Sequence, residues 1–391
     1  MHILFDLRTY KKLSMSAGIY LADMVDAFLP ALQEGDQVTI LMALKSYLPW
    51  EQIEHPAVHY LFARETPCTA AGRKELNAIV QRIHPDLWWT ADAALTPPAK
   101  TRRHAVKSVF AIEDFRHLYG SAHGSGLGKW WQRRRARQHL LKADAIVCPN
   151  KAIAAHLAHR LGIALRHRLV MIPSGIHPVF RVHQPDEILQ MRRKWLIPQR
   201  YLLMVSTSVT AHYLTPVLEA LGTNTEVSSI HCVILGDTKL PNTLRETIRD
   251  CHLNGLVRFI DNEKLSPAEL SALYSGAFLL FEPSQDVAYQ PSILRAMACG
   301  TPVICAACAA NEDVFKQAVL RVHPTDTREW SQALSTFTLS AILYERQVQR
   351  GLAFAATATS TTMAKTSFAF ARRLCTSTPS EIRRQDRAAH P

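Results

Sequence analysis

Short apolar runs recur along the chain, and between them apolar residues return every three or four positions. The runs have the length of buried β-strands, and the segments between them have the periodicity of α-helices. In the first half this pattern predicts strands at residues 2–7, 37–44, 86–89, 106–114, 143–150 and 168–176, with helices at 19–32 and 151–162. Strands that alternate with helices predict a parallel sheet covered on both faces.

The same alternation restarts after a polar stretch at residues 184–200. The second half has predicted strands at 201–208, 231–237, 257–262, 276–284 and 301–307, with helices at 266–276 and 291–300. We therefore expect an α/β fold with domains at residues 1–183 and 184–352, a helix at 353–375 that packs back on the N-terminal domain, and a disordered tail at 376–391. Ligands of such sheets bind beyond the carboxyl ends of the strands, which predicts a cleft between the two domains.

Composition excludes several classes of protein. The chain has 391 residues, a length suited to two domains, with 48% apolar and 20% charged residues, which is ordinary for a soluble globular protein. No apolar run has the length of a membrane span, and the start MHILFDLRTYKK predicts no signal peptide. The eight cysteines, with one CxxC at Cys305 and Cys308, suggest neither a metal site nor a disulfide framework, so we expect the reducing cytosol.

The charge balance is basic, since 45 Lys and Arg against 33 Asp and Glu give a formal net charge of +12. The clearest basic run extends from Lys129 to Lys142 and contains Trp130, Trp131, Arg133, Arg134 and Arg135. Arginine beside tryptophan suits an anionic membrane surface, and a nucleic acid offers similar phosphates. A solvated helix face with the tryptophans turned inward is the third interpretation. No nucleic-acid module accompanies the run, so no nucleic-acid partner is expected.

Four segments stand out together: FDLRTYKKLSMSAGIYLADMVDAF; ADAIVCPNKAIAAHLAHRLGI followed by RLVMIPSGIHPVF; YLLMVSTS; and VRFIDNEKLSPAELSALYSGAFLLFEPS followed by RAMACGTPVICA. In this order and spacing they resemble the retaining glycosyltransferases of family four. The resemblance runs through most of the chain and is most specific at RAMACGTPVICA. It implies the GT-B fold, in which two Rossmann-like domains with parallel sheets face each other across a cleft.

The resemblance also implies a site for a nucleotide diphosphate sugar, with no metal or cofactor. Family members stabilise the leaving diphosphate with an Arg–Lys pair and helix N-termini, contact the donor through two glutamates in an E-x7-E motif, and place a His near the reacting sugar. In this chain the Arg–Lys pair falls on Ala211 and His212, the glutamates fall on Val287 and Arg295, and the His falls on Glu113. Ala211 supplies no charge and His212 is mostly neutral at pH 7, so the family's clamp is not retained. Val287 offers no hydrogen bond and Arg295 cannot accept one from a ribose hydroxyl, so the glutamates are not retained either.

Other residues at the predicted strand ends are candidates to replace them. Glu113, Asp114 and Asp286 are the candidate catalytic carboxylates, with Glu282 on the same loop as Asp286. The candidate donor-binding residues are Gly18, Ser206, Thr207, His212, Gly236, Lys239, Ser284, Ser292 and Arg295. For each of these residues a structural role, as a turn, a helix cap, an ion pair or a solvated loop position, stays open.

Two functions fit the sequence. The first is a retaining glycosyltransferase that moves a hexose from a nucleotide diphosphate sugar to a surface polysaccharide or a lipid-linked glycan, in the cytoplasm or at the inner face of the membrane. The second is a catalytically inactive GT-B protein that acts as a partner, chaperone or glycan-binding subunit. The joint loss of the glutamates and the phosphate clamp favours the second function, and the preserved architecture of the donor domain favours the first.

Overall fold

The computed structural model describes residues 1–10, 19–44, 54–99, 105–114, 126–206, 211–224, 230–236, 241–285, 290–308, 312 and 314–376. The described residues form two compact units. The first unit contains the chain up to Gly175 together with Ser360–Thr376, and the second contains Ile176–Thr359. The chain therefore leaves the first unit, builds the whole second unit, and returns.

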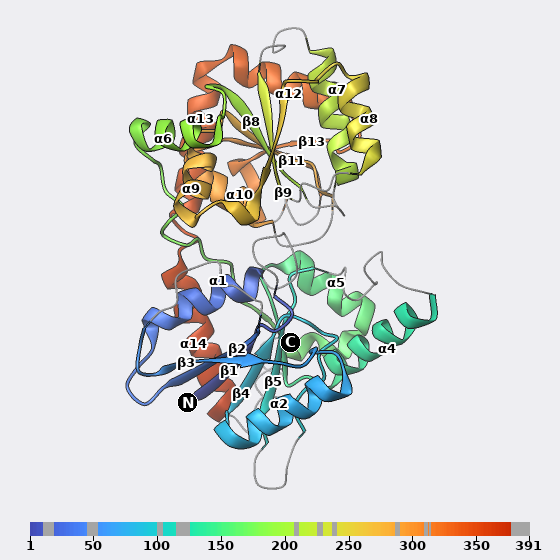
Figure 1. The fold of residues 1–391 in the computed structure, drawn as a ribbon, viewed down its shortest axis with the longest axis vertical. Helices are drawn as coiled ribbons and strands as arrows, with labels where there is room; N and C mark the ends of the chain where they lie inside the picture. Colours follow the sequence, from blue (N-terminus) through green and yellow to red (C-terminus); the bar gives the residue numbers. More distant parts are fainter. Residues whose placement is uncertain are drawn as a thin grey trace. The chain divides into compact units, whose positions relative to one another are not determined.

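The first unit is built on a parallel seven-stranded sheet (Figure 1). Its strands, in spatial order, are β3 (Val58–Ala63), β2 (Gln37–Ala43), β1 (His2–Asp6), β4 (Leu87–Thr90), β5 (Lys107–Ala111), β6 (Ala145–Cys148) and β7 (Leu169–Met171). The central strand β4 is buried along its whole length, including Trp88 and Trp89, as expected for a strand covered on both faces.

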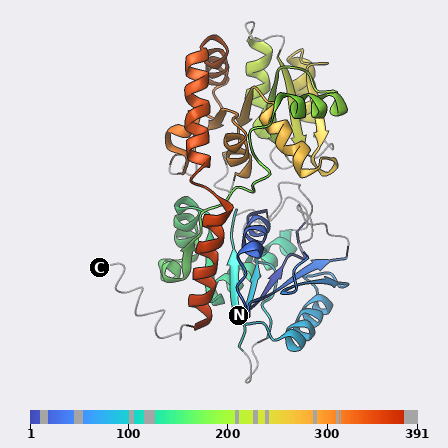
Figure 2. The same cartoon turned by 90° about the vertical axis from the view of Figure 1, so that its left-hand side faces the viewer.

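The helices of the first unit are α1 (Ile19–Phe28), α2 (Ala70–Ile83), α4 (Gly126–Lys142), α5 (Lys151–Leu161) and α14 (Ser360–Thr376). Short 3-10 turns lie at η1 (Leu29–Ala31) and η2 (Ile163–Arg168). The last helix, α14, packs along α1 (Figures 1 and 2). Between them the rings of Phe368 and Phe28 stack with their centroids 3.9 Å apart. The C-terminal segment therefore completes the core of the first unit.

The second unit has a parallel six-stranded sheet. Its strands, in spatial order, are β10 (Val257–Asp261), β9 (His231–Gly236), β8 (Tyr201–Ser206), β11 (Leu279–Glu282), β12 (Val303–Ala306) and β13 (Leu320–Val322). The helices are α6 (Pro185–Trp195), α7 (Thr215–Thr223), α8 (Asn242–Asp250), α9 (Pro267–Ser275), α10 (Pro291–Ala298), α12 (Thr327–Leu339) and α13 (Ala341–Ala355), with 3-10 turns η3 (Ala211–Leu214), η5 (Asn262–Lys264) and η6 (Lys316–Ala318).

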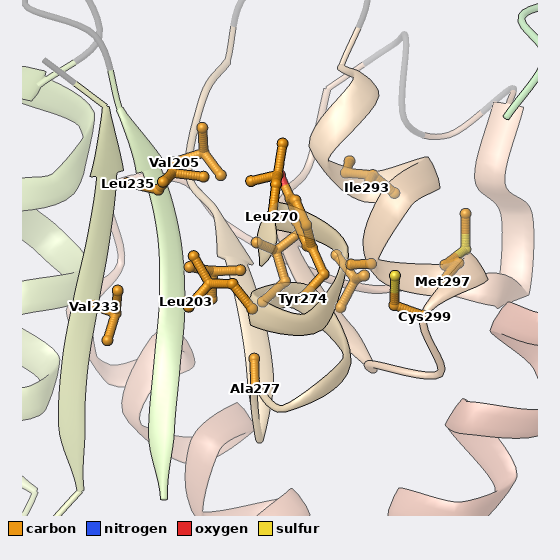
Figure 3. Packing of buried hydrophobic residues seen from close by; sticks show 14 of the residues in the cluster. Leu203, Val205, Val233, Leu235, Leu270, Tyr274, Ala277, Ile293, Met297 and Cys299 are labelled. Atoms are coloured by element: carbon orange, nitrogen blue, oxygen red, sulfur yellow. The ribbon is translucent and has the colours of Figure 1, made fainter. Parts of the chain in front are cut away.

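Strand β8 shows why this sheet needs two helical layers. All six of its residues are buried, and successive side chains of a strand point to opposite faces. Leu203 and Val205 join the cluster that contains residues of α9 and α10, part of which is shown in Figure 3. Leu202 and Met204 join the other cluster, which contains residues of α7, α8 and α12. Both faces are covered by apolar side chains, which is why this continuous apolar run of the sequence forms an inner strand of the sheet.

The two parallel sheets confirm the expected α/β fold with two Rossmann-like domains. The structure divides the chain after Gly175, rather than after residue 183. The reason is that the segment before α6 is bound to α9: the His183 amide donates to Ser275 Oγ at 2.9 Å, and Ser271 Oγ donates to the Val179 carbonyl at 2.7 Å. These contacts hold the segment in the second unit.

Other details of the structure also differ from the expected organisation. The helix expected at 353–375 is two helices, because α13 ends at Ala355 and α14 begins at Ser360. Strands β3 and β13 were not predicted. The expected disordered tail at 376–391 lies outside the described residues beyond Thr376. Over the described ranges, no helix combines the length and the apolar character that crossing a membrane requires.

Candidate functional site

The carboxyl ends of β8 and β9 meet in the second unit at Ser206 and Gly236, which are paired in register. Gly236 has a φ of +153°, and a Cβ built on it would lie 1.8 Å from the Ser206 carbonyl oxygen. Only glycine permits this approach, because any side chain would collide with the neighbouring backbone. The packing of β8 against β9 therefore requires glycine at the candidate Gly236. This position lies at the edge of the sheet where ligands of parallel sheets bind.

The end of β11 and the start of α10 hold a buried carboxylate. Glu282 is the last residue of β11 and is only 3% exposed. Ser292, in the first turn of α10 and fully buried, donates a hydrogen bond from Oγ to Glu282 Oε2 at 2.5 Å. A carboxylate beside a helix N-terminus is stabilised by the helix dipole as well as by the hydroxyl. The candidate Ser292 thus holds Glu282 beneath the start of α10.

Gln290 immediately precedes α10 and is buried. Its Nε2 donates to the carbonyl of the candidate Ser284 at 3.2 Å. Its Oε1 is shielded from solvent and accepts no hydrogen bond within the described part of the chain. A buried acceptor without a partner is costly, so this oxygen marks a place where a donor from water or a ligand would be stabilised.

Arg295 lies on α10, one helical turn after Ser292. Its guanidinium carbon lies 4.8 Å from the centre of the Phe180 ring, within the range of a cation–π contact. Burial raises the pKa of the Tyr274 hydroxyl, an effect that the charge of Arg295 opposes and the charge of Glu282 increases. Tyr274, on α9, therefore lies within the electrostatic influence of both residues.

The two positions that align with the family's Arg–Lys pair, Ala211 and His212, carry no permanent cation. Ala211 is buried in the core of the second unit, and only His212, in η3, is exposed. The imidazole of His212 lies against the Tyr213 ring, with the centroids 3.9 Å apart. Four other candidates, Gly18, Thr207, Lys239 and Asp286, lie outside the described residues.

Two candidate carboxylates lie in the first unit, after β5. Glu113 and Asp114 are both buried. Glu113 Oε2 accepts a hydrogen bond from the backbone amide of Tyr20 at 2.6 Å. Tyr20 is in the first turn of α1, so this carboxylate satisfies one of the amides that a helix start leaves without a partner. Glu113 therefore supports α1 rather than projecting an unused carboxylate, a role the sequence left open as a helix cap.

The candidate membrane residues lie on α4, which belongs to the first unit. Trp130 and Trp131 are 50% and 63% exposed, and Arg133, Arg134 and Arg135 are exposed as well. The interpretation in which both tryptophans turn inward is therefore wrong. The inward positions are instead taken by the small Ala136 and by Leu140.

Sequence reasoning did not single out Gln290 and Phe180, which contact the candidates Ser284 and Arg295. Gln290 had a local signal, because it directly precedes the proline that begins α10 and so occupies the helix cap. Phe180 had none, since its contact with Arg295 joins residues that are far apart in the chain.

Comparisons with known protein families and structures agree with this architecture. Residues 188–353 match the sequence model of "Glycosyl transferases group 1", and residues 19–180 match that of "Glycosyltransferase Family 4". Among curated proteins, the O-antigen chain mannosyltransferase RfbU of Salmonella typhimurium is 31% identical over 102 residues. That match spans 26% of this chain and 28% of RfbU.

Among solved structures, the sucrose-phosphate synthase of Thermosynechococcus elongatus has a TM-score of 0.74 at 16% identity, covering 96% of this chain and 99% of that one. WaaG, a glycosyltransferase involved in lipopolysaccharide biosynthesis, has a TM-score of 0.69 at 17% identity, covering 96% and 100%. Anabaena HepE, solved in complex with UDP-glucose, has a TM-score of 0.70 at 13% identity, covering 95% and 100%. At these identities the structural likeness concerns the fold.

Proposed function

Since the chain belongs to the group 1 glycosyltransferases, with an N-terminal domain of glycosyltransferase family 4, we propose that it transfers a hexose from a nucleotide diphosphate sugar to a surface polysaccharide or lipid-linked glycan. The family supports the reaction class. RfbU, by its name a mannosyltransferase of the O-antigen chain, supports the acceptor class, and HepE, solved with UDP-glucose, supports the donor class. Retention of anomeric configuration is part of the same proposal.

One observation carries the proposal: the start of α10, beside the carboxyl end of β11, brings together a buried carboxylate, a guanidinium and an amide oxygen that accepts no hydrogen bond from the described residues. These are Glu282 held by Ser292, Gln290 Oε1, and Arg295 on Phe180. A nucleotide sugar offers partners to both kinds of group in this cluster, since its hydroxyls donate hydrogen bonds and its diphosphate accepts them. A helix start suits the diphosphate further, because its amides and dipole favour negative charge.

The chemistry at this cluster follows from charge. Breaking the bond between sugar and diphosphate leaves growing negative charge on the nucleoside diphosphate, which must be stabilised as it develops. We assign this task to the Arg295 guanidinium together with the first amides of α10. Ser206, Ser284 and His212 are kept as donor-binding residues, and Asp114 as the carboxylate that orients the acceptor hydroxyl.

A nucleotide-sugar titration tests donor binding directly. The protein is titrated with UDP-, GDP-, ADP- and TDP-sugars by calorimetry and thermal shift. A true donor at 100 times its dissociation constant should stabilise the folded protein by about 2.7 kcal/mol. Transfer is then measured with the donor that binds, and nuclear magnetic resonance of the product gives the anomeric configuration.

Arg295→Ala tests the assigned cation. Loss of a charge-assisted hydrogen bond to diphosphate should weaken donor binding by about tenfold to a hundredfold. Arg200→Ala is the matched control, because the Arg200 guanidinium also lies over a phenylalanine, at 4.1 Å from the Phe278 ring centre, but next to the start of β8. Equal losses in the two variants would remove Arg295 from the site.

The catalytically inactive alternative predicts a different result. A protein kept as a partner, chaperone or glycan-binding subunit should bind none of the sugar nucleotides, or should bind one without hydrolysing or transferring it. Either outcome, with the fold intact by circular dichroism, would overturn the proposed transferase activity.

A further inference from the structure

Helix α4 presents a face that neither the core nor the proposed donor site uses. We define the α4 face as Trp130, Trp131, Arg133, Arg134, Arg135 and Arg137, all of which are exposed. Two neighbouring indoles at 50% and 63% exposure are costly in water, since aromatic side chains carry large apolar surfaces. The sequence of α4, GLGKWWQRRRARQHLLK, contains no acidic residue to balance the arginines.

The other side of α4 is fixed to the first unit. Ala136 and Leu140 are buried, and His139 Nδ1 lies 3.0 Å from the Ala93 carbonyl oxygen. After the helix ends, Arg168 donates from Nη1 to the carbonyls of Leu141 and Ala143, at 2.9 and 3.1 Å. A cation that caps the last carbonyls complements the dipole of the helix. The α4 face is therefore displayed by an anchored helix.

The spacing along the helix groups the indoles with an arginine. Arg134 follows Trp130 by four residues and Trp131 by three, so the three side chains neighbour one another on the helix surface. The Arg134 guanidinium carbon lies 5.4 Å from the Trp130 ring centre. Aromatic rings at the level of lipid headgroups, with arginines that reach the phosphates, are the combination that anchors proteins at a membrane interface.

We infer that the α4 face docks this protein on an anionic membrane surface, with Trp130 and Trp131 in the headgroup region and Arg133, Arg134, Arg135 and Arg137 on lipid phosphates. The ring geometry favours a membrane over a nucleic acid. The two indoles lie at 83° to each other on a convex helix, with centroids 5.0 Å apart, and so form no parallel platform on which successive bases could stack.

Flotation with lipid vesicles tests this inference without any sugar donor, so its result is independent of the proposed function. The full chain is mixed with vesicles of phosphatidylcholine alone or with about 30% phosphatidylglycerol, at about 0.05 and 0.5 M NaCl. We expect binding to the anionic vesicles that weakens at high salt, with a blue shift of tryptophan fluorescence. Equal binding to both vesicle types, or no binding to either, would overturn the inference.

Two sets of variants assign the binding to α4. Replacing Arg133, Arg134 and Arg135 together by Ser should weaken binding about a hundredfold, since each charge near the surface contributes about fivefold. The matched control replaces Arg73, Lys74 and Arg82, three exposed cations of α2 in the same unit, and should change binding by less than about threefold.

A second pair of variants tests the contribution of the two tryptophans to membrane binding. Trp130→Ala with Trp131→Ala should abolish the blue shift and most of the binding, whereas Phe62→Ala, at an exposed phenylalanine of strand β3, should preserve both. Melting curves confirm that each variant is folded, and the salt dependence of the unmodified chain provides a readout that needs no variant. Equal effects of the α4 and control variants would contradict the inference. Binding of single-stranded RNA is measured for the same variants. If the unmodified chain binds RNA but no vesicles, and the α4 variants lose the RNA binding, the inference is also contradicted.

Discussion

Gly236 is required by its neighbour in the sheet. Replacing it by Ala brings a Cβ to within 1.8 Å of the Ser206 carbonyl oxygen, at a φ that L-residues rarely adopt, and we expect a loss of about 3 kcal/mol or more in the free energy of unfolding. Gly255→Ala is the control, because Gly255 also has a positive φ, +84°, but nothing lies within 4 Å of its added Cβ. That variant should lose about 1 kcal/mol. Chemical denaturation measures both, and similar losses would contradict the steric account.

Asp26 predicts a pH dependence of stability. Burial raises the pKa of its carboxyl from 3.8 to about 6. Between pH 3.8 and about 6, Asp26 keeps its proton in the folded chain but has released it in the unfolded chain. The stability of the folded chain that depends on protonated Asp26 is therefore full below about pH 4 and is lost as the pH rises through about 6.

Asp26→Asn removes the ionisation and should flatten this part of the pH profile. The variant should be more stable than the unmodified chain at pH 8 by about 1–3 kcal/mol, from a pKa difference of about 2 units. Urea unfolding between pH 4 and 8 measures the effect, with Asp23→Asn on the same helix as the control for charge. An unchanged slope in Asp26→Asn would refute the assignment.

At the scale of elements, α1 depends on a carboxylate from a distant strand. Glu113 follows β5 and accepts the Tyr20 amide at 2.6 Å, across 93 positions of sequence. Glu113→Gln keeps the shape but removes the charge that favours a helix start, and should cost about 1–2 kcal/mol. Thermal melting compares it with Glu34→Gln, an exposed glutamate in the same unit. A stability loss no greater than that of the control would show that the contact is dispensable.

The start of α10 shows the same principle in the second unit. The hydroxyl of Ser292 is used to hold Glu282, while Gln290 supplies the residue before the helix. At this helix the proposed function therefore assigns Arg295 to ligand binding, while Ser292 serves the packing of the element itself. A simple transfer of the family's glutamate positions, which fall on Val287 and Arg295, includes neither Glu282 nor Gln290.

At the scale of the molecule, α14 is the last described helix, yet it belongs to the unit formed first along the chain. Its Phe368 stacks on Phe28, and its Phe370 meets the Trp89 ring edge-on, with centroids 5.5 Å apart. A chain truncated after Thr359 should therefore lose the thermal transition of the first unit, or shift it strongly downward, and keep that of the second.

Two point variants give the matched comparison in the full chain. Phe368→Ala should destabilise the first unit by about 3 kcal/mol, and Phe354→Ala, which removes a ring packed on Phe315, should act on the second. Differential scanning calorimetry resolves which transition moves. A single transition that responds equally to both variants would contradict the division into two thermodynamic units.

The sequence by itself determined most of the local elements, though not β3 or β13, and the class of fold. Apolar runs such as YLLMVS become buried parallel strands because a strand covered on both faces needs apolar side chains on both. The order of these elements, with RAMACGTPVICA, was enough to identify the family. The exposure of the arginines on α4 could also be predicted from the sequence, because a helix with so many neighbouring arginines cannot bury them.

Only the tertiary structure decided what each polar group near the sites does. The cap on α1 by Glu113, the pair of Glu282 with Ser292, and the contact of Arg295 with Phe180 each join residues from different elements. A C-terminal helix that packs back on the first domain was expected, but the stacking of its Phe368 on Phe28 was not. Periodicity along a chain reports which face of an element is apolar, whereas partners across space depend on how the elements pack.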